Sequence, residues 1–215
     1  MTEPFPEPRR VFLGVSGASG ALYALRTLRM LCDAGVRVDL CVSPSARRVL
    51  REEQDLDWDG ADAADLLDGD REAARRVRIW DHADVGAPPA SGTALGEAVV
   101  VVPCSLTTLS GLATGRAGNL IERAAQVALK EGRRLVVVPR ETPLTRTHLD
   151  QLSALAWAGA VVLPAAPGFY HRPRSVVDLV DHVAAKVLGV LDVPQSRVAP
   201  WAGGVEAASE REGER

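Results

Sequence analysis

The hydrophobic residues of this chain fall into short, valine-rich runs that alternate with longer amphipathic stretches. The runs at 98–103, 134–139 and 160–165 are apolar at nearly every position rather than at alternate ones. Such runs are typical of parallel strands that are covered by helices on both faces of the sheet. The pattern predicts six strands, at 9–15, 36–42, 77–81, 98–103, 134–139 and 160–165.

Helical spacing separates the strands. The first amphipathic stretch has a leucine at about every third residue and ends at Gly35, which acts as a stop signal. Asn119 and Ser175 are suitable N-terminal caps for two later helices. Helices are predicted at 20–34, 119–132, 142–159 and 175–191. This alternation predicts a doubly wound α/β fold with a mostly parallel sheet and right-handed crossovers.

The same pattern sets the expected domain limits. We expect a flexible N-terminus at 1–8, a single domain over 9–195 and a C-terminal tail at 196–215. The tail is polar and charged, and we expect it to be disordered from about residue 203. Residues 82–93 contain two prolines and two glycines and form a long loop, which in such folds often carries function.

Charge is weak overall but segregated along the chain. The 215 residues carry a net charge of −3, which does not suggest a nucleic-acid or membrane partner. Residues 116–146 hold seven Arg or Lys against three Glu, whereas residues 52–84 hold twelve acids against four Arg. The two segments are either solvated faces or, for the basic one, cations gathered around an anionic ligand.

Cysteine and histidine usage argues against disulfides and metal. Cys32, Cys41 and Cys104 are an odd number without CxxC spacing, so we expect reduced, buried thiols in a cytoplasmic protein. The four histidines fit no metal-ligand spacing. No apolar run approaches the length of a membrane span, and the N-terminal residues show no signal-peptide pattern.

The glycine-rich loop "VSGASG" at 15–20 follows the first predicted strand and raises the question of a phosphate ligand. A dinucleotide fingerprint is missing, because Val15 stands at the second glycine position and Ser43 stands where the ribose-binding acid would be. A P-loop is also absent, and the hydrolase motif G-x-S-x-G fails at its last position.

Hydroxyl side chains cluster at or just after the predicted strand ends. Each one alone is most simply a helix N-cap, but several such loops together favour a shared anion site at the carboxyl ends of the strands. These residues are Ser16, Ser19, Ser43, Ser45, Ser105, Thr107 and Thr108.

Four long segments resemble the flavin prenyltransferases of the UbiX type. They read "GVSGASGALYALR", "VVPCSLTTLSGLATG", "NLIERAAQVALKEGRRLVVVPRETPL" and "LPAAPGFYHRPRSVVDLVDHVAAKVLG". The resemblance covers roughly residues 10–195 in the expected order, which is far more specific than a lone glycine motif.

The resemblance implies a flavodoxin-like or Rossmann-like domain that binds FMN and assembles as a homododecamer. Members of the family transfer a dimethylallyl group from dimethylallyl monophosphate to N5 and C6 of reduced FMN, without a metal. The prenylated FMN then serves (de)carboxylases of the UbiD type.

The resemblance also assigns site residues. It implies FMN binding by Gly17, Ala18, Ser19, Ser43, Ser105, Leu106, Thr107, Thr108 and Arg140. It implies binding of dimethylallyl phosphate by Tyr170, Lys186, Arg123, Lys130, Arg140, Ser91 and Gly92, where cations hold the departing phosphate. Catalytic roles fall on Ser19, Glu53, Glu141 and Lys130, with Glu141 as a proton relay.

Three positions depart from the family pattern. Lys186 replaces a common Arg and lacks its bidentate fork, and Thr107 replaces a frequent Lys. Val85 stands where some relatives have a Trp. These departures leave open whether the donor is a monophosphate or a diphosphate.

Two other functions remain as alternatives. One is a flavin-dependent decarboxylase of the same fold, although the chain has "PCSLTT" where those enzymes have a P-A-S-A-N-like loop, and no nearby His. The other is a non-catalytic FMN-binding companion, which would not need a second phosphate site.

Overall fold

A computed structural model describes residues 9–199, in which six parallel strands form one sheet in the order β3-β2-β1-β4-β5-β6. All six predicted strands are confirmed. The sixth is shorter than predicted, although the N–H groups of Leu163 and Ala165 still donate to the carbonyls of Val137 and Pro139. The strands are β1 Arg10–Val15, β2 Arg37–Val42, β3 Val77–Trp80, β4 Ala98–Cys104, β5 Arg134–Pro139 and β6 Val161–Val162.

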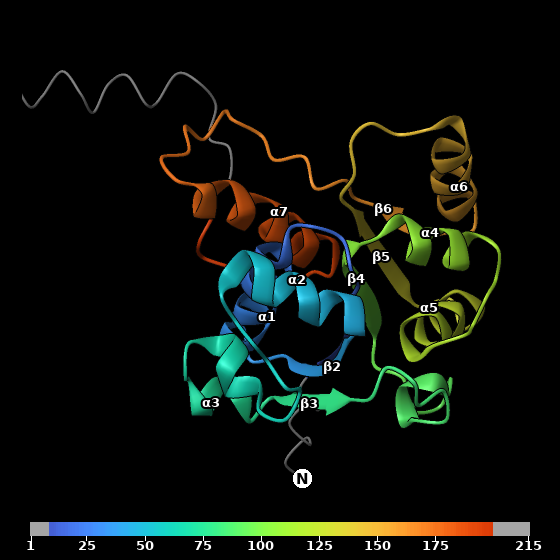
Figure 1. Cartoon of the computed structure of the whole chain (residues 1–215), viewed down its shortest axis with the longest axis horizontal. Helices are drawn as coiled ribbons and strands as arrows, with labels where there is room; N and C mark the ends of the chain where they lie inside the picture. The colour runs from blue at the N-terminus through green and yellow to red at the C-terminus, as the bar shows by residue number, and fades with distance from the viewer. Residues whose placement is uncertain (1–8, 200–215) are drawn as a thin grey trace, which may run out of the picture.

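The four predicted helices are confirmed as α1, α5, α6 and α7, and the structure adds shorter ones (Figure 1). The helices are α1 Ala21–Asp33, α2 Pro44–Gln54, α3 Arg71–Ala74, α4 Leu106–Ala113, α5 Leu120–Lys130, α6 Arg146–Trp157 and α7 Val176–Val190. The 3₁₀ turns are η1 Ala63–Leu67 and η2 Pro88–Ala90. The sequence pattern misses α2 because only Ala46 and Leu50 of this charged helix are buried.

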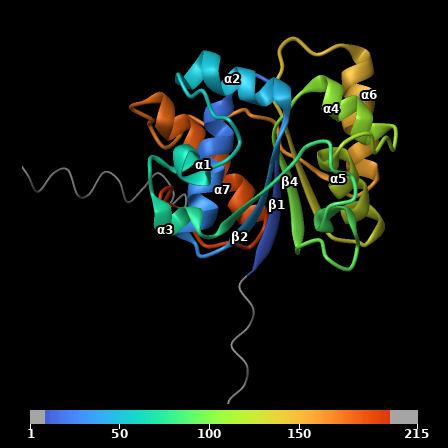
Figure 2. The same ribbon diagram turned by 60° about the horizontal axis from the view of Figure 1, so that its bottom comes forward.

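Helices cover both faces of the sheet, with α1 and α7 on one side and α4, α5 and α6 on the other (Figures 1 and 2). Val11 and Leu13 of β1 pack into the first core, whereas Phe12 between them packs into the second. Both faces of each central strand are therefore buried, which explains the unbroken apolar runs.

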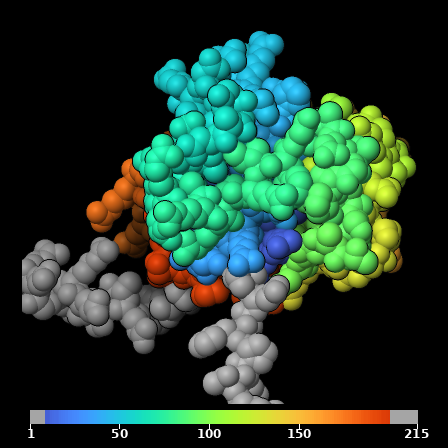
Figure 3. All heavy atoms as spheres, turned by 90° about the horizontal axis from the view of Figure 1, so that it is seen from below, coloured from blue at the N-terminus to red at the C-terminus, as the bar shows by residue number. Residues whose placement is uncertain are grey.

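The chain between α2 and β4 wraps the β3 end of the sheet (Figure 3). This segment holds ten of the twelve acids of residues 52–84, and its carboxylates pair with nearby arginines, as in Arg51–Asp57 and Arg71–Asp62. Those four side chains are all at least 40% exposed. The acidic segment is therefore a solvated face.

The strand order places the topological switch point between β1 and β4. Connections from these neighbouring strands leave for opposite faces, which opens a crevice at their carboxyl ends. We call this side of the sheet the carboxyl edge, and the side where the strands begin the amino edge. A ligand site in such a fold is expected at the carboxyl edge.

All three cysteines are buried and unpaired, as predicted. Burial raises the pKa of Cys32 and of Cys41 to about 12 and raises the pKa of Cys104 further still. We expect no thiol to react with an aromatic disulfide reagent at neutral pH in the folded protein, and all three to react after unfolding. Rapid labelling of the native protein would contradict this expectation.

The predicted N-terminus 1–8, and the predicted tail from residue 200, lie outside the described residues. Residues 196–199 pack against the domain, where Arg197 pairs with Asp33 at 2.6 Å. Within 9–199, no helix has both the length and the apolar character needed to cross a membrane. The same residues contain no cluster of three or more His, Cys, Asp or Glu that could hold a metal ion.

Candidate active site

The loop after β1 is tied to the end of β4 by Ser16. The Ser16 hydroxyl donates to the carbonyl of Pro103 at 2.9 Å and accepts from the N–H of Ser105 at 2.7 Å. Only 2% of Ser16 is exposed. Ser16 therefore joins the two strands at the switch point rather than contacting a ligand.

Packing and backbone conformation require glycine at two positions of this loop. A Cβ atom on Gly17 would lie 2.3 Å from the Cβ of Ser45, so only glycine lets the loop lie against the first turn of α2. Gly20 precedes α1 with a φ of 104°, in the left-handed region that favours glycine. Local structure therefore explains why these glycines are present. Their spacing does not match a dinucleotide fingerprint.

Glu53, at the end of α2, caps the N-terminus of α1. Its carboxylate accepts from the N–H of Gly20 at 2.8 Å and from the N–H of Ala21 at 2.9 Å. Burial raises the pKa of Glu53, but hydrogen bonds from Ser19, Ala21 and Gly20 and the charge of Arg140 outweigh it, so the pKa lies below its usual range. The start of α1 thus already holds an anion, and a bound phosphate must use other donors.

We expect Glu53→Ala to destabilise the protein by about 1 kcal/mol, because α1 loses its only acidic cap. The melting temperature should fall by roughly 2–4 °C, measured by thermal circular dichroism. Glu52→Ala is the matched control, since Glu52 is exposed and, within residues 9–199, pairs only with Arg48 in its own helix. An equal loss in both variants would contradict the capping role.

Arg140 completes a cluster with Ser19 and Glu53. It follows the last residue of β5, and its Nε donates to the carbonyl of Ser19 at 2.8 Å. Tyr23 lies next to Gly20 and close enough to Arg140 for the arginine charge to lower its pKa, although burial raises that pKa overall. Tyr23 was not predicted from the sequence, although its position in the first turn of α1, directly after the glycine-rich loop, was the available signal.

Ser43 and Ser105 act as helix N-caps. Ser43 Oγ accepts from the N–H of Ala46 at 3.1 Å, and Ser105 Oγ accepts from the N–H of Thr108 at 3.3 Å. Pro44 has no N–H, and the N–H groups of Ser43 and Ser105 bond Val15 and Ser16, so the donors left for an anion are the N–H of Ser45 in α2 and those of Leu106 and Thr107 in α4. Leu106 is half-buried and Thr107 is exposed at the start of α4.

Tyr170 and Lys186 line a groove of about 440 Å³ between α7, the loop before it and residues 195–199 after it, which we call the second groove to distinguish it from the carboxyl edge. Its wall also includes His182 and Gly189. The structure therefore brings together a phenol and an ammonium that the sequence analysis assigned to the prenyl phosphate.

Arg123 and Glu141 lie at the carboxyl edge and are exposed. Arg123 is in the first turns of α5, whose start is joined to the loop after β3 through the N–H of Leu120 and the carbonyl of His82. Glu141 directly follows Arg140, and its carboxylate accepts from the N–H of Thr142 at 3.0 Å. Val85 is 46% exposed in the long loop.

Lys130, Ser91 and Gly92 lie at the opposite, amino edge. Lys130 is the last residue of α5, four positions before β5 begins, and it pairs with Glu131 at 2.6 Å. Gly92 lies against Glu131 and accepts a hydrogen bond from Arg133 at 2.6 Å. The seven residues of β4 span about 20 Å, so one chain does not bring these residues to the cluster around Arg140.

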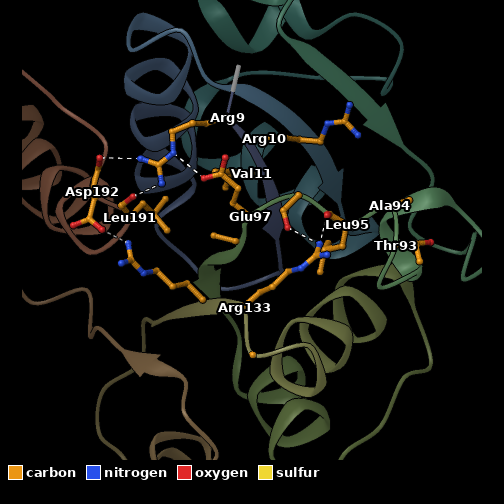
Figure 4. A pocket seen from close by; sticks show the side chains of 14 residues that line it. Arg9, Arg10, Val11, Thr93, Ala94, Leu95, Glu97, Arg133, Leu191 and Asp192 are labelled. Atoms are coloured by element: carbon orange, nitrogen blue, oxygen red, sulfur yellow. Dashed lines mark hydrogen bonds and ion pairs between the residues drawn. The ribbon is translucent and has the colours of Figure 1, made fainter. Parts of the chain in front are cut away.

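A cleft of about 710 Å³ also opens at the amino edge, and Figure 4 shows the arginines around it. Arg9 bonds Glu97 at 2.8 Å and the carbonyls of Leu191 and Asp192, while Arg133 bonds the carbonyls of Leu95 and Gly96 (Figure 4). These contacts tie β1, the loop before β4 and the end of α7 together.

The basic segment 116–146 therefore does not gather around one ligand. Arg116 pairs with the buried Glu122, and Arg133 and Arg134 tie the amino edge. Arg123 and Arg140 of this segment lie at the carboxyl edge, where Arg116 is paired with Glu122.

Comparison with known proteins agrees with this architecture. Residues 5–188 match the family model described as Flavoprotein. The flavin prenyltransferase UbiX of Pseudomonas aeruginosa is 47% identical over 197 residues, which cover 90% of this chain and 94% of the relative.

Two solved structures are similar along almost the whole chain. AnUbiX in complex with FMN and dimethylallyl pyrophosphate superposes with a TM-score of 0.81 at 32% identity, covering 92% of this chain and 99% of the other. A dodecameric FMN-dependent UbiX-like decarboxylase from Escherichia coli O157:H7 gives 0.79 at 34% identity, with 90% and 100% covered.

The fold and the family model thus define an α/β flavoprotein. Within that class, the chain belongs to the UbiX family of flavin prenyltransferases, as the sequence motifs predict.

Proposed function

We propose that this protein transfers a dimethylallyl group from dimethylallyl monophosphate to N5 and C6 of reduced FMN. One observation carries the proposal. Apart from the cluster of Ser19, Glu53 and Arg140, the chain has a second groove in which Tyr170 and Lys186 offer a hydroxyl and a cation to another phosphate. A protein that only binds flavin does not need that groove.

The donors of the carboxyl edge fit the phosphate and ribityl chain of FMN. Hydroxyls, main-chain N–H groups and one arginine are what a phosphate monoester binds. We assign FMN binding to Gly17, Ala18 and Ser19, to Ser43, to the run 105–108 and to Arg140. When bound in its reduced form, FMN supplies the nucleophilic nitrogen and carbon of the reaction.

Departure of the allylic phosphate requires positive charge and hydrogen-bond donors where negative charge develops. Lys186 and Tyr170 provide these in the second groove, and Arg140 and Arg123 provide them at the carboxyl edge. Because Lys186 is a point charge rather than a planar fork, it holds the phosphate with less directional constraint than an arginine would.

The second bond requires removal of a proton. Glu141 is the carboxylate assigned to that relay, since it is exposed beside Arg140. Glu53 is ionised but already accepts from two N–H groups, so its part is to hold the loop of Ser19. The released phosphate is an additional base.

We further propose that the site is completed by oligomerisation. The similar protein from Escherichia coli is dodecameric, and a homododecamer of this chain would place Lys130, Ser91 and Gly92 of one subunit at the carboxyl edge of another. This arrangement accounts for site residues that one chain holds about 20 Å apart. In this assembly, the amino edge of each subunit completes the site of a neighbouring subunit and not the site of its own chain.

The product, prenylated FMN, would pass to a (de)carboxylase of the UbiD type. The three buried, unpaired thiols favour a reducing compartment, which we take to be the cytoplasm.

The test is mass spectrometry of the flavin after anaerobic incubation with reduced FMN and dimethylallyl monophosphate. A gain of one C5 unit with release of phosphate supports prenyl transfer. Transfer only from the diphosphate would change the donor. Unchanged flavin with both donors favours the FMN-binding companion, and CO₂ release from a cysteine-ending peptide favours the decarboxylase.

A further inference from the structure

His182 lies beneath Tyr170 in the second groove. It belongs to α7 and is 6% exposed. Its Nδ1 is 3.2 Å from the main-chain nitrogen of Gly168, and its Nε2 is 3.0 Å from the hydroxyl oxygen of Tyr170. Both ring nitrogens are thus engaged by the loop that precedes α7.

The Gly168 contact determines which nitrogen of His182 carries the proton. A main-chain N–H can only donate, so Nδ1 must accept and is unprotonated. In the neutral ring the hydrogen is then on Nε2, which donates to the oxygen of Tyr170. The hydroxyl hydrogen of Tyr170 therefore cannot be directed at His182.

We propose that His182 is a positioning residue that makes Tyr170 a hydrogen-bond donor to the substrate phosphate. This inference rests on the proposed function of the groove that Tyr170 shares with Lys186. With the opposite tautomer, Tyr170 would donate to His182 and present a lone pair to an anion. The Gly168 N–H prevents that arrangement.

Ring packing holds the pair in place. His171 stacks on His182 with ring centroids 5.0 Å apart and an 8° interplanar angle. Tyr170 meets both imidazoles edge-on, at centroid distances of 5.6 Å and 5.5 Å. Ring contacts thus hold the phenol as well as the hydrogen bond.

The surroundings keep His182 neutral. Burial, followed by electrostatic repulsion from His171 and Lys186, lowers the pKa of His182 below the ordinary value of 6.5. On the same helix, Asp178 bonds the N–H groups of Arg174 and Ser175.

Asp181, also on α7, is held by Arg26 of α1 at 2.5 Å. Protonation of His182 would add a hydrogen to Nδ1 and oppose the N–H of Gly168. Acid should therefore loosen the loop that carries Tyr170.

Two substitutions separate the contacts of His182. An asparagine side chain reaches the Nδ1 position and can still accept from Gly168, but it does not reach Tyr170. A glutamine side chain reaches the Nε2 position and can still donate to Tyr170. We compare His182→Asn, His182→Gln, Tyr170→Phe and the double variant Tyr170→Phe with His182→Asn.

The measurements use the FMN-loaded oligomer. Calorimetry gives the Kd of dimethylallyl monophosphate, and anaerobic turnover gives KM and kcat. We expect His182→Asn to weaken binding about tenfold, because one hydrogen bond to a charged phosphate is misdirected. His182→Gln should stay within about threefold of the wild type. In the Tyr170→Phe background, His182→Asn should have no further effect.

The pH dependence gives an independent readout. Substrate phosphate itself titrates near pH 6, and this contribution is common to all variants. Wild-type KM should rise more steeply below pH 6.5 than KM of His182→Gln, which has no imidazole to protonate.

The outcomes are distinguishable. Unchanged binding in His182→Asn, or effects of His182→Asn and Tyr170→Phe that multiply, would overturn the positioning role while leaving prenyl transfer intact. A wild-type protein that binds dimethylallyl monophosphate with the expected His182 dependence but transfers nothing would overturn the proposed function and retain the inference.

Discussion

Mixed oligomers of Arg140→Ala and Lys130→Ala subunits are expected to recover about a quarter of the wild-type rate of prenyl transfer. Each variant alone should be about 100-fold slower, because each removes a cation that stabilises the departing phosphate. Arg140 lies at the carboxyl edge beside Ser19, whereas Lys130 lies at the amino edge beside Glu131.

The expected recovery of about a quarter follows from the random mixing of the two kinds of subunit in the oligomer. When the two variants are co-expressed equally, half of the subunits have Arg140 and half have Lys130. A site that takes one residue from each of two subunits is then intact in about one case in four. Mass spectrometry of the flavin product measures the recovered rate.

The control mixes Arg140→Ala with Ser19→Ala. These residues touch within one chain, where Arg140 Nε donates to the carbonyl of Ser19, so no mixed site regains both. Recovery in this control, or no recovery in the Arg140 and Lys130 mixture, would contradict a site shared between subunits.

Glu122→Ala is expected to destabilise the fold by about 2–3 kcal/mol. The Glu122 side chain is 1% exposed, accepts from Arg116 at 2.6 Å and from the N–H of Gly118 at 2.9 Å, and so holds the turn between α4 and α5. Without it, the Gly118 N–H loses its acceptor and α5 loses the anchor that sets its start. The melting temperature should fall by roughly 5–10 °C in calorimetry.

The same contacts predict a pH dependence. Burial raises the pKa of Glu122, but hydrogen bonds from Arg116 and Gly118 outweigh it and hold the pKa below its ordinary value of 4.5. A carboxyl whose pKa is lowered by folding stabilises the protein above that ordinary value, and the stabilisation is lost as pH falls through the folded-state pKa. Wild type should therefore lose its advantage over Glu122→Ala on acidification.

Glu131→Ala is the matched control for this experiment, because Glu131 is an exposed acid just beyond the other end of the same helix. It should leave the melting temperature nearly unchanged. A Glu122→Ala protein as stable as this control would show that the turn does not depend on the buried carboxylate.

Strands and long helices were predictable because their signals are local. A strand buried on both faces needs an apolar residue at nearly every position, so β4 and β5 are visible as valine runs. Helix α2 was not predictable in this way, because only two of its eleven residues, Ala46 and Leu50, are buried. Missing α2 also hid the reason why Glu53 reaches the start of α1.

The candidate site was predictable only where residues directly follow strands. Ser19, Ser105 and Arg140 follow β1, β4 and β5, and parallel strands end at the same edge, so their proximity follows from the fold class. The contacts of Tyr23 with Gly20, and of His182 with Gly168, depend on how helices pack against loops. Residue spacing along the sequence does not predict these contacts.

The sequence by itself determined the parallel α/β sheet, the hydroxyl-rich loops at its carboxyl edge and the membership in the UbiX family. Only the tertiary structure decided which assigned residues meet. Because α5 runs antiparallel to the strands, it carries Arg123 at one edge and ends with Lys130 at the other. Helix direction relative to the sheet, and not residue type, separates the two halves of the site.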